Sequence, residues 1–106
     1  SRKKPPNSNP PQPSEPQPFL IVVETSRFGK DLERQLRRGR DPRRFAAVMR
    51  LLGARQTLPA ALRDHALTGP WSGCRDCHVE PDWILIYEVT PTELILHRTG
   101  THSDLF

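Results

Sequence analysis

The boundary between Pro18 and Phe19 separates two parts of the chain with different compositions. Residues 1–18 hold 7 of the 12 prolines and no aliphatic or aromatic side chain, so they cannot bury enough apolar surface to offset the entropy of ordering. We expect a disordered, proline-rich tail there. Residues 19–106 suffice for one small domain with a modest core, which excludes a two-domain or large-cofactor enzyme.

Charge is distributed unevenly within the net +4. Residues 26–64 carry 11 Lys and Arg side chains against four acids, whereas residues 65–106 carry two against six. A surface of one sign attracts an oppositely charged partner, so we expect nucleic acid or an acidic protein. The sequence has no apolar run that would span a membrane or form a signal peptide, and two cysteines make no secreted disulfide framework. We therefore expect a cytoplasmic protein without a membrane partner.

Local patterns predict a strand followed by two helices in the first half. The β-branched run at 19–23 predicts the strand. Ser26 is the expected N-cap of a first helix, in which apolar residues recur at 28, 32 and 36 and which Gly39 ends. Asp41 and Pro42 are the expected cap and first residue of a second helix. The short joint between them predicts a helical hairpin.

The second half predicts a sheet. Residues 54–70 show no sustained period, which favours a loop with one helical turn near 59–63. Strand-like runs follow at about 72–79, 83–89 and 94–100, separated by proline-containing turns. We expect an α+β fold, in which a mostly antiparallel sheet of about four strands packs against the N-terminal helical hairpin.

Side-chain alternation predicts which strand residues share a face of the sheet. With hairpin loops of even length, His78 and Arg98 share one face, and extension of the last strand adds His102 beside Asp82. His97 falls on the opposite face and is interpreted as a bystander. An odd loop would invert the assignment. The predicted face of His78 also holds Trp83, Leu85, Tyr87 and Leu96, and the predicted helix-packing face holds Cys77, Val79, Ile84, Ile86 and Ile95.

These residue types suit RNA cleavage by transesterification. An imidazole both accepts and donates protons near neutral pH. One base would activate the ribose 2′-hydroxyl, one acid would protonate the departing 5′-oxygen, and a cation would stabilise the phosphorane.

The C-x-x-C-H string at residues 74–78 matches c-type haem attachment. In a strand, however, residues three apart point to opposite faces, so the two sulfurs cannot address one haem edge. The same geometry argues against a local disulfide and against zinc, for which a second Cys/His pair is missing. We expect no metal and no cofactor, with Cys77 as a small core residue.

Several strings carry a family likeness. They are Arg-Asp-His at 63–65, Trp-Ser-Gly at 71–73, His-Val-Glu-Pro-Asp-Trp at 78–83 and the final nine residues, 98–106. Together they closely resemble the YafQ branch of the RelE/ParE toxin superfamily, and the likeness covers nearly all of residues 19–106. It implies a RelE-like fold and a ribosome-dependent mRNA endoribonuclease, or mRNA interferase. This enzyme would be the toxin of a type II toxin-antitoxin system, cut A-site mRNA without a metal and inhibit translation.

The resemblance also implies roles for individual residues. Acid/base and phosphate-stabilising positions fall on His65, His78, Asp82 and His102, with His102 as the acid and His65 or His78, aided by Asp82, as the base. Trp83 and Phe106 would hold the mRNA, and Arg98 is added as a cation from its face and charge. Contacts to ribosomal RNA are expected from Lys30, Arg34, Arg37, Arg38, Arg40, Arg43 and Arg44.

Partners and alternatives follow from the same likeness. A protein antitoxin would cover the site, often in a heterotetramer that binds its own operator DNA. Ala66 and Cys74 stand where the family usually has proline and tyrosine, which leaves reduced activity open. The alternatives are a ParE-like inhibitor of a protein such as DNA gyrase, which needs no convergent histidines, and an inactive antitoxin-binding remnant.

Overall fold

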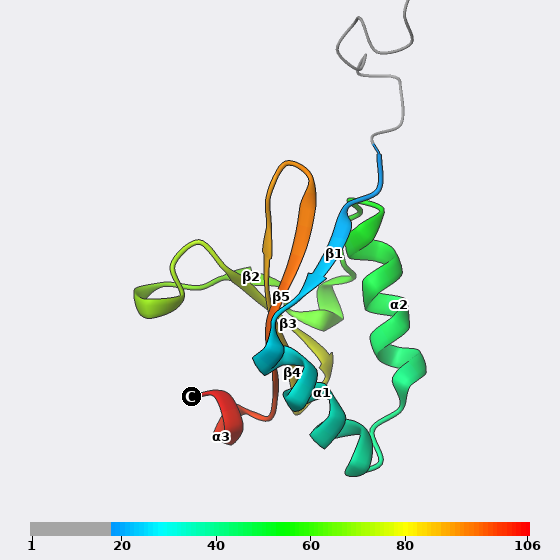
Figure 1. Cartoon of the computed structure of the whole chain (residues 1–106), viewed down its shortest axis with the longest axis vertical. Helices are drawn as coiled ribbons and strands as arrows, with labels where there is room; N and C mark the ends of the chain where they lie inside the picture. The colour runs from blue at the N-terminus through cyan, green and yellow to red at the C-terminus, as the bar shows by residue number, and fades with distance from the viewer. Residues whose placement is uncertain (1–17) are drawn as a thin grey trace, which may run out of the picture.

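The computed structural model describes residues 18–106, so the predicted tail lies outside the described residues apart from Pro18. None of the described helices is long and apolar enough to cross a membrane. Two single 3₁₀ turns, η1 (Ala60–Leu62) and η2 (Gly69–Trp71), interrupt the long connection after the second helix. The other elements, drawn in Figure 1, are β1 (Ile21–Glu24), α1 (Ser26–Arg37), α2 (Pro42–Gly53), β2 (His65–Ala66), β3 (Arg75–Glu80), β4 (Trp83–Val89), β5 (Glu93–Gly100) and α3 (His102–Leu105).

The five strands form one sheet in the order β1-β5-β4-β3-β2. β1 pairs with β5 in parallel, and the other neighbours are antiparallel, which confirms the mostly antiparallel α+β fold. The fifth strand, β2, lies in the segment predicted to be a loop, where His65 and Ala66 pair with Asp76 and Arg75. Two residues are too few to produce an alternating pattern in the sequence.

Polar caps set the starts of both long helices. Asp41 caps α2 as predicted, because its Oδ1 accepts a hydrogen bond from the Arg43 amide at 2.9 Å. For α1 the cap is Thr25 rather than the predicted Ser26. The Thr25 hydroxyl accepts from the Phe28 amide at 3.0 Å and donates to the His97 carbonyl on β5 at 3.2 Å. This second bond joins residues far apart in the sequence and could not be predicted locally.

The main core lies between the sheet and helices α1 and α2, which cover the same face (Figure 1). A smaller cluster on the other face consists of Cys74, Ile84 and Ile86, covered by Leu67, Trp71 and Leu105. The predicted faces are therefore wrong. The main core contains Cys77 and Val79 as expected, but together with Trp83, Leu85, Tyr87 and Leu96.

A β-bulge is the physical reason for this difference. His78 lies opposite Ile84, whereas Glu80 lies opposite Trp83, so the register shifts by one residue before the turn. His78 therefore shares the face of Ile84, and Trp83 points into the helix-packed core. A second register shift, between Ile86 and Tyr87 on β4, accompanies a change of face at His97. Its ring lies 6.0 Å from that of Trp71, in the smaller cluster.

The chain leaves the sheet at Gly100 and enters α3, so the predicted continuation of the strand to His102 is wrong. Thr101 caps the helix by accepting from the Asp104 amide at 3.1 Å, and Asp104 accepts from the Thr101 amide at 3.0 Å. A Cβ at position 100 would lie 2.9 Å from the Cβ of Asp104. Glycine thus permits the close approach that turns His102 back over the sheet.

Candidate functional site

Three of the four histidines surround the carboxylate of Asp76. His65 is on β2, His78 is two residues from Asp76 on the same face of β3, and His102 begins α3. Asp76 is only 4% exposed. Burial raises the pKa of this carboxyl, while the positive charges that His65, His78 and His102 can carry act in the opposite direction. The structure thus brings together the three histidines that the sequence singled out, around an acid that it did not.

The carboxylate of Asp76 is close to His65 but weakly bonded to it. The Asp76 Oδ1 atom lies 3.1 Å from Nδ1 of His65. That Nδ1 atom also lies 2.9 Å from the Arg63 carbonyl oxygen. Within the described residues, Asp76 Oδ1 is left without a well-directed hydrogen bond. A buried carboxylate oxygen therefore remains available to an imidazole that becomes charged.

Backbone carbonyls select the tautomers of two imidazoles. His65 Nδ1 faces the Arg63 carbonyl, and His78 Nδ1 lies 3.1 Å from the Pro81 carbonyl. A carbonyl oxygen can only accept, so in the neutral rings Nδ1 carries the proton and Nε2 carries the lone pair. Both rings are therefore arranged to accept a proton at Nε2.

His102 and Phe106 form the exposed side of the cluster. The ring of His102 lies 6.2 Å from that of His78 and 5.5 Å from that of Phe106. Within residues 18–106, the His102 imidazole has no hydrogen-bond partner. Phe106 is 59% exposed. An exposed aromatic ring beside an exposed imidazole offers a surface on which a nucleobase can stack.

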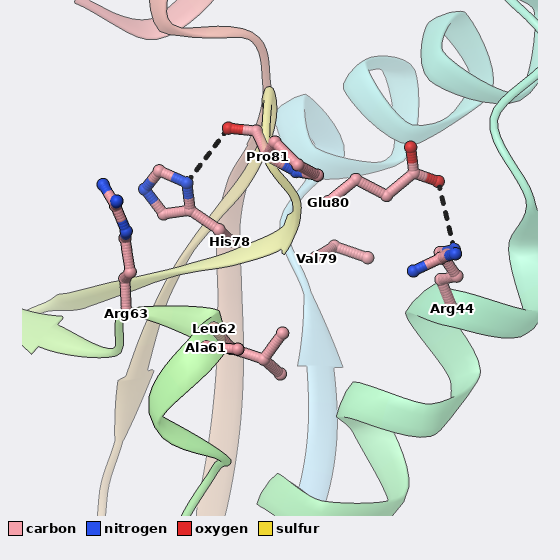
Figure 2. Close-up of a pocket in the computed structure, with 8 residues that line it drawn as sticks. All are labelled: Arg44, Ala61, Leu62, Arg63, His78, Val79, Glu80 and Pro81. Atoms are coloured by element: carbon pink, nitrogen blue, oxygen red, sulfur yellow. Dashed lines mark hydrogen bonds and ion pairs between the residues drawn. The ribbon is translucent and has the colours of Figure 1, made fainter.

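A cleft of about 420 Å³ opens beside His78. Figure 2 shows Arg63 and His78 together on one side of this cleft and the Arg44–Glu80 ion pair, at 3.8 Å, on the other. Arg63 is exposed, has a left-handed backbone with φ of 52°, and forms no ion pair within the described part of the chain. The sequence analysis missed both Arg63 and Asp76. The i, i+2 spacing of Asp76 and His78 was a usable signal, whereas Arg63 had none.

Asp82 occupies the turn between β3 and β4. Its side chain is exposed, and its backbone carbonyl accepts from Nη2 of Arg40 at 2.9 Å. No hydrogen bond or ion pair between its carboxylate and a described residue is formed. The structure therefore places Asp82 beside the cluster in the fold without contact to an imidazole.

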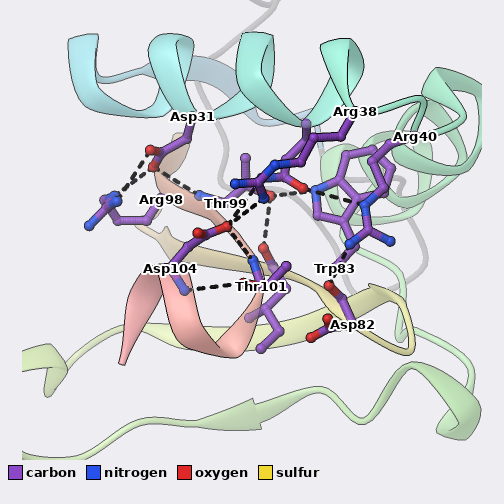
Figure 3. A network of polar contacts seen from close by, with 11 residues as sticks. Asp31, Arg38, Arg40, Asp82, Trp83, Arg98, Thr99, Thr101 and Asp104 are labelled. Atoms are coloured by element: carbon purple, nitrogen blue, oxygen red, sulfur yellow. Dashed lines mark hydrogen bonds and ion pairs between the residues drawn. The ribbon is translucent and has the colours of Figure 1, made fainter.

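Trp83 does not have the position expected of an mRNA contact. It is 0% exposed, its Nε1 donates to the Thr99 hydroxyl at 2.8 Å, and its ring stacks near Phe45 with 6.2 Å between centroids. Arg40 lies over the ring at 5.8 Å (Figure 3). The bulge in β3 is the reason for this burial. Direct stacking of Trp83 on RNA is thus contradicted by the structure, and the residue supports the turn that carries Asp82.

Arg98 is a paired cation rather than the free one that was predicted. Its Nε and Nη2 atoms both donate to the carboxylate of Asp31, which is 3% exposed and also accepts from the Thr99 amide at 3.2 Å (Figure 3). This pairing raises the pKa of Arg98. Because the bidentate contact uses Nε and Nη2, the donors on Nη1 remain for another acceptor.

Most of the basic residues predicted to contact ribosomal RNA are paired with acids. Arg38 Nη1 lies 2.9 Å from Asp104, an ion pair that joins α1 to α3. This hydrogen bond, followed by that from the Thr101 amide, holds the pKa of Asp104 well below its usual range. Lys30 and Arg34 have no acidic partner within the described residues. The other pairs are Arg37–Glu33, Arg40–Glu80, Arg43–Asp41 and Arg44–Glu80.

Comparisons with known proteins agree with one another. Residues 20–106 match the family model described as bacterial toxin of type II toxin-antitoxin system, YafQ. The chain is 45% identical over 83 residues to the mRNA interferase toxin YafQ of Escherichia coli strain K12, across 77% of this chain and 90% of that protein. The fold is similar to the crystal structure of the E. coli DinJ-YafQ toxin-antitoxin complex, with TM-score 0.77 and 42% identity over 83% of this chain and 98% of that chain. It is also similar to a metal-bound toxin from Helicobacter pylori, with TM-score 0.78 and 33% identity over 83% of this chain and 100% of that chain.

Proposed function

The chain belongs to the YafQ family of bacterial type II toxin-antitoxin toxins, and we propose that it is an mRNA interferase. In this proposal it binds the ribosome, cuts A-site mRNA without a metal, and thereby stops translation. The convergence of His65, His78 and His102 on the buried Asp76 carries the proposal. The mRNA interferase name of the E. coli relative supports it.

The proposed reaction is attack of a ribose 2′-oxygen on the adjacent phosphorus. Nε2 of His65 accepts the 2′-hydroxyl proton, and Asp76 Oδ1, 3.1 Å from Nδ1, stabilises the imidazolium that results. His78 has the same tautomer and is the alternative base. The P–O5′ bond then breaks, and His102 delivers a proton to the departing 5′-oxygen. The products are a 2′,3′-cyclic phosphate and a free 5′-hydroxyl.

The remaining groups hold the substrate. Arg63, exposed at the cleft beside His78, and the free Nη1 of Arg98 are the cations that we assign to the phosphorane. Phe106 stacks on a base beside His102. Asp82 contributes negative charge at the turn and orients an imidazole only after substrate has bound.

Two macromolecular partners follow from this proposal. Lys30 and Arg34 have no acidic partner within residues 18–106 and make the first contacts with ribosomal RNA, which places the protein in the cytoplasm. The paired arginines 37, 38, 40, 43 and 44 exchange their acids for phosphates. The solved DinJ-YafQ complex supports a protein antitoxin as the second partner of this chain. We place it over the histidine cluster, in a heterotetramer that contacts operator DNA only through the antitoxin.

The test is a map of mRNA 5′ ends after a short pulse of expression without antitoxin. We expect new ends in codon register for the wild type and for the control variant Ser103→Ala, whose exposed side chain lies beside His102 on α3. For His102→Ala we expect a loss of about 10²- to 10⁴-fold in the cleavage rate, with an unchanged melting temperature.

Other outcomes separate the alternatives. Growth arrest without new ends would favour a ParE-like inhibitor. Neither arrest nor ends, in a protein shown to be folded, would indicate an inactive remnant. Undiminished cleavage by a folded His102→Ala variant would overturn the assignment of the acid.

A further inference from the structure

Three metal-binding side chains meet at the other end of the sheet from the histidine cluster. They are Cys74, immediately before β3, Glu88 on β4 and His97 on β5. The Cys74 Sγ atom, a carboxylate oxygen of Glu88 and a ring nitrogen of His97 all lie within 4.8 Å of one another. Nε2 of His97 is 3.0 Å from Oε1 of Glu88. Nothing in the proposed cleavage reaction uses these residues.

The sheet itself builds this grouping. Arg75 pairs with Tyr87, so the preceding residue, Cys74, comes beside Glu88 in the antiparallel ladder. The register shift in the β4–β5 pairing brings His97 to the same face, where Trp71 lies 6.0 Å from its ring. Cys74 is 8% exposed, whereas the side chains of Glu88 and His97 are 38% and 26% exposed. A solvated ion can therefore enter from the side of Glu88 and His97.

From this geometry we propose that Cys74, Glu88 and His97 bind a zinc-type divalent cation. Thiolate sulfur, imidazole nitrogen and carboxylate oxygen are the three donor types that zinc uses, at about 2.0 to 2.3 Å from the metal. In a tetrahedron of that size the ligand atoms are roughly 3.5 Å apart, which the present spacing reaches with small side-chain movements. Three protein ligands leave the fourth position to water.

The site differs from the C-x-x-C-H string excluded in the sequence analysis. Cys77 is 0% exposed and lies in the main core, on the other face of the sheet from Cys74. The ligands come instead from three adjacent strands and are 14 and 23 positions from Cys74 in the sequence. Cys74 is also the position at which this chain departs from the tyrosine usual in the family, so the site is a property of this chain.

The cation has a structural role. Ile84 lies opposite His78, and Glu88 is four residues further along β4, which separates the two sites by about 13 Å along the strand. A metal at Cys74 links the 67–74 loop to β4 and β5, and so holds the edge of the sheet from which β2 presents His65.

The test adds Co²⁺ as a spectroscopic probe and Zn²⁺ as a stabiliser to the purified full chain. We expect one equivalent of Co²⁺ to bind with a thiolate-to-cobalt charge-transfer band. Zn²⁺ at 100 times its dissociation constant should raise the folding equilibrium constant about 100-fold, which for a domain of this size is a rise in melting temperature of roughly 10 to 20 °C.

Two variants report on the ligands. Cys74→Ser should abolish the charge-transfer band, and His97→Gln should weaken Co²⁺ binding at least about tenfold while keeping the thiol. A double variant, His78→Gln with His102→Gln, removes the other histidine cluster and should bind Co²⁺ with the band intact. No band in the wild type would overturn the proposal. So would a band or a Zn²⁺ effect that survives Cys74→Ser or disappears in the double variant.

Discussion

Asp31→Ala should destabilise the fold more than any exposed substitution on the same helix. The Asp31 side chain is 4% exposed and that of Arg98 12%, so the change leaves a largely buried guanidinium and the Thr99 amide without their acceptor. Breaking a buried ion pair by removing one partner costs about 3 to 5 kcal/mol. Each kcal/mol lowers the melting temperature of a domain this size by roughly 4 to 8 °C. We therefore expect a fall of at least about 12 °C, measured by circular dichroism.

Two further variants isolate the ion pair. Glu33→Ala on the same helix removes an exposed pair with Arg37 and should cost less than about 0.5 kcal/mol. The double variant Asp31→Leu with Arg98→Met replaces both charges by apolar groups and should recover most of the loss. A fall for Asp31→Ala no larger than that for Glu33→Ala would refute this reasoning. So would a double variant as unstable as Asp31→Ala.

Three other changes probe the site. Burial raises the pKa of Asp76 above its ordinary 3.8, so the folded state binds more protons and ionisation costs stability at neutral pH. Asp76→Asn should raise the melting temperature there, by an amount that shrinks as pH falls toward 3.8, while cleavage slows; a calorimetric difference independent of pH would contradict this. Gly100→Ala places a Cβ 2.9 Å from that of Asp104 and should cost about 1 to 3 kcal/mol in urea unfolding, with slower cleavage because His102 moves; unchanged stability would disprove the close approach. Deletion of Phe106, 59% exposed, should abolish cleavage at an unchanged melting temperature, and the opposite result would make Phe106 a packing residue.

The sequence alone determined the elements that depend on near neighbours. The Asp41–Pro42 start of α2 and the helical turn near residue 60 are confirmed, because capping and turn formation involve residues only a few positions apart. The order of one strand, two helices and a mostly antiparallel sheet is confirmed as well. The short motifs also indicated the family, which the match over residues 20–106 confirms.

The tertiary structure decided which faces and partners those elements have. One extra residue before the β3–β4 turn moved Trp83 into the core, because strand side chains alternate with period two and a shift of one inverts every face. The buried acid among the histidines, the pairing of Arg98 with Asp31 and the grouping of Cys74 with His97 all join residues brought close only by folding. No pattern within a short stretch of sequence records such contacts, because they depend on strand register and on helix placement over the whole sheet.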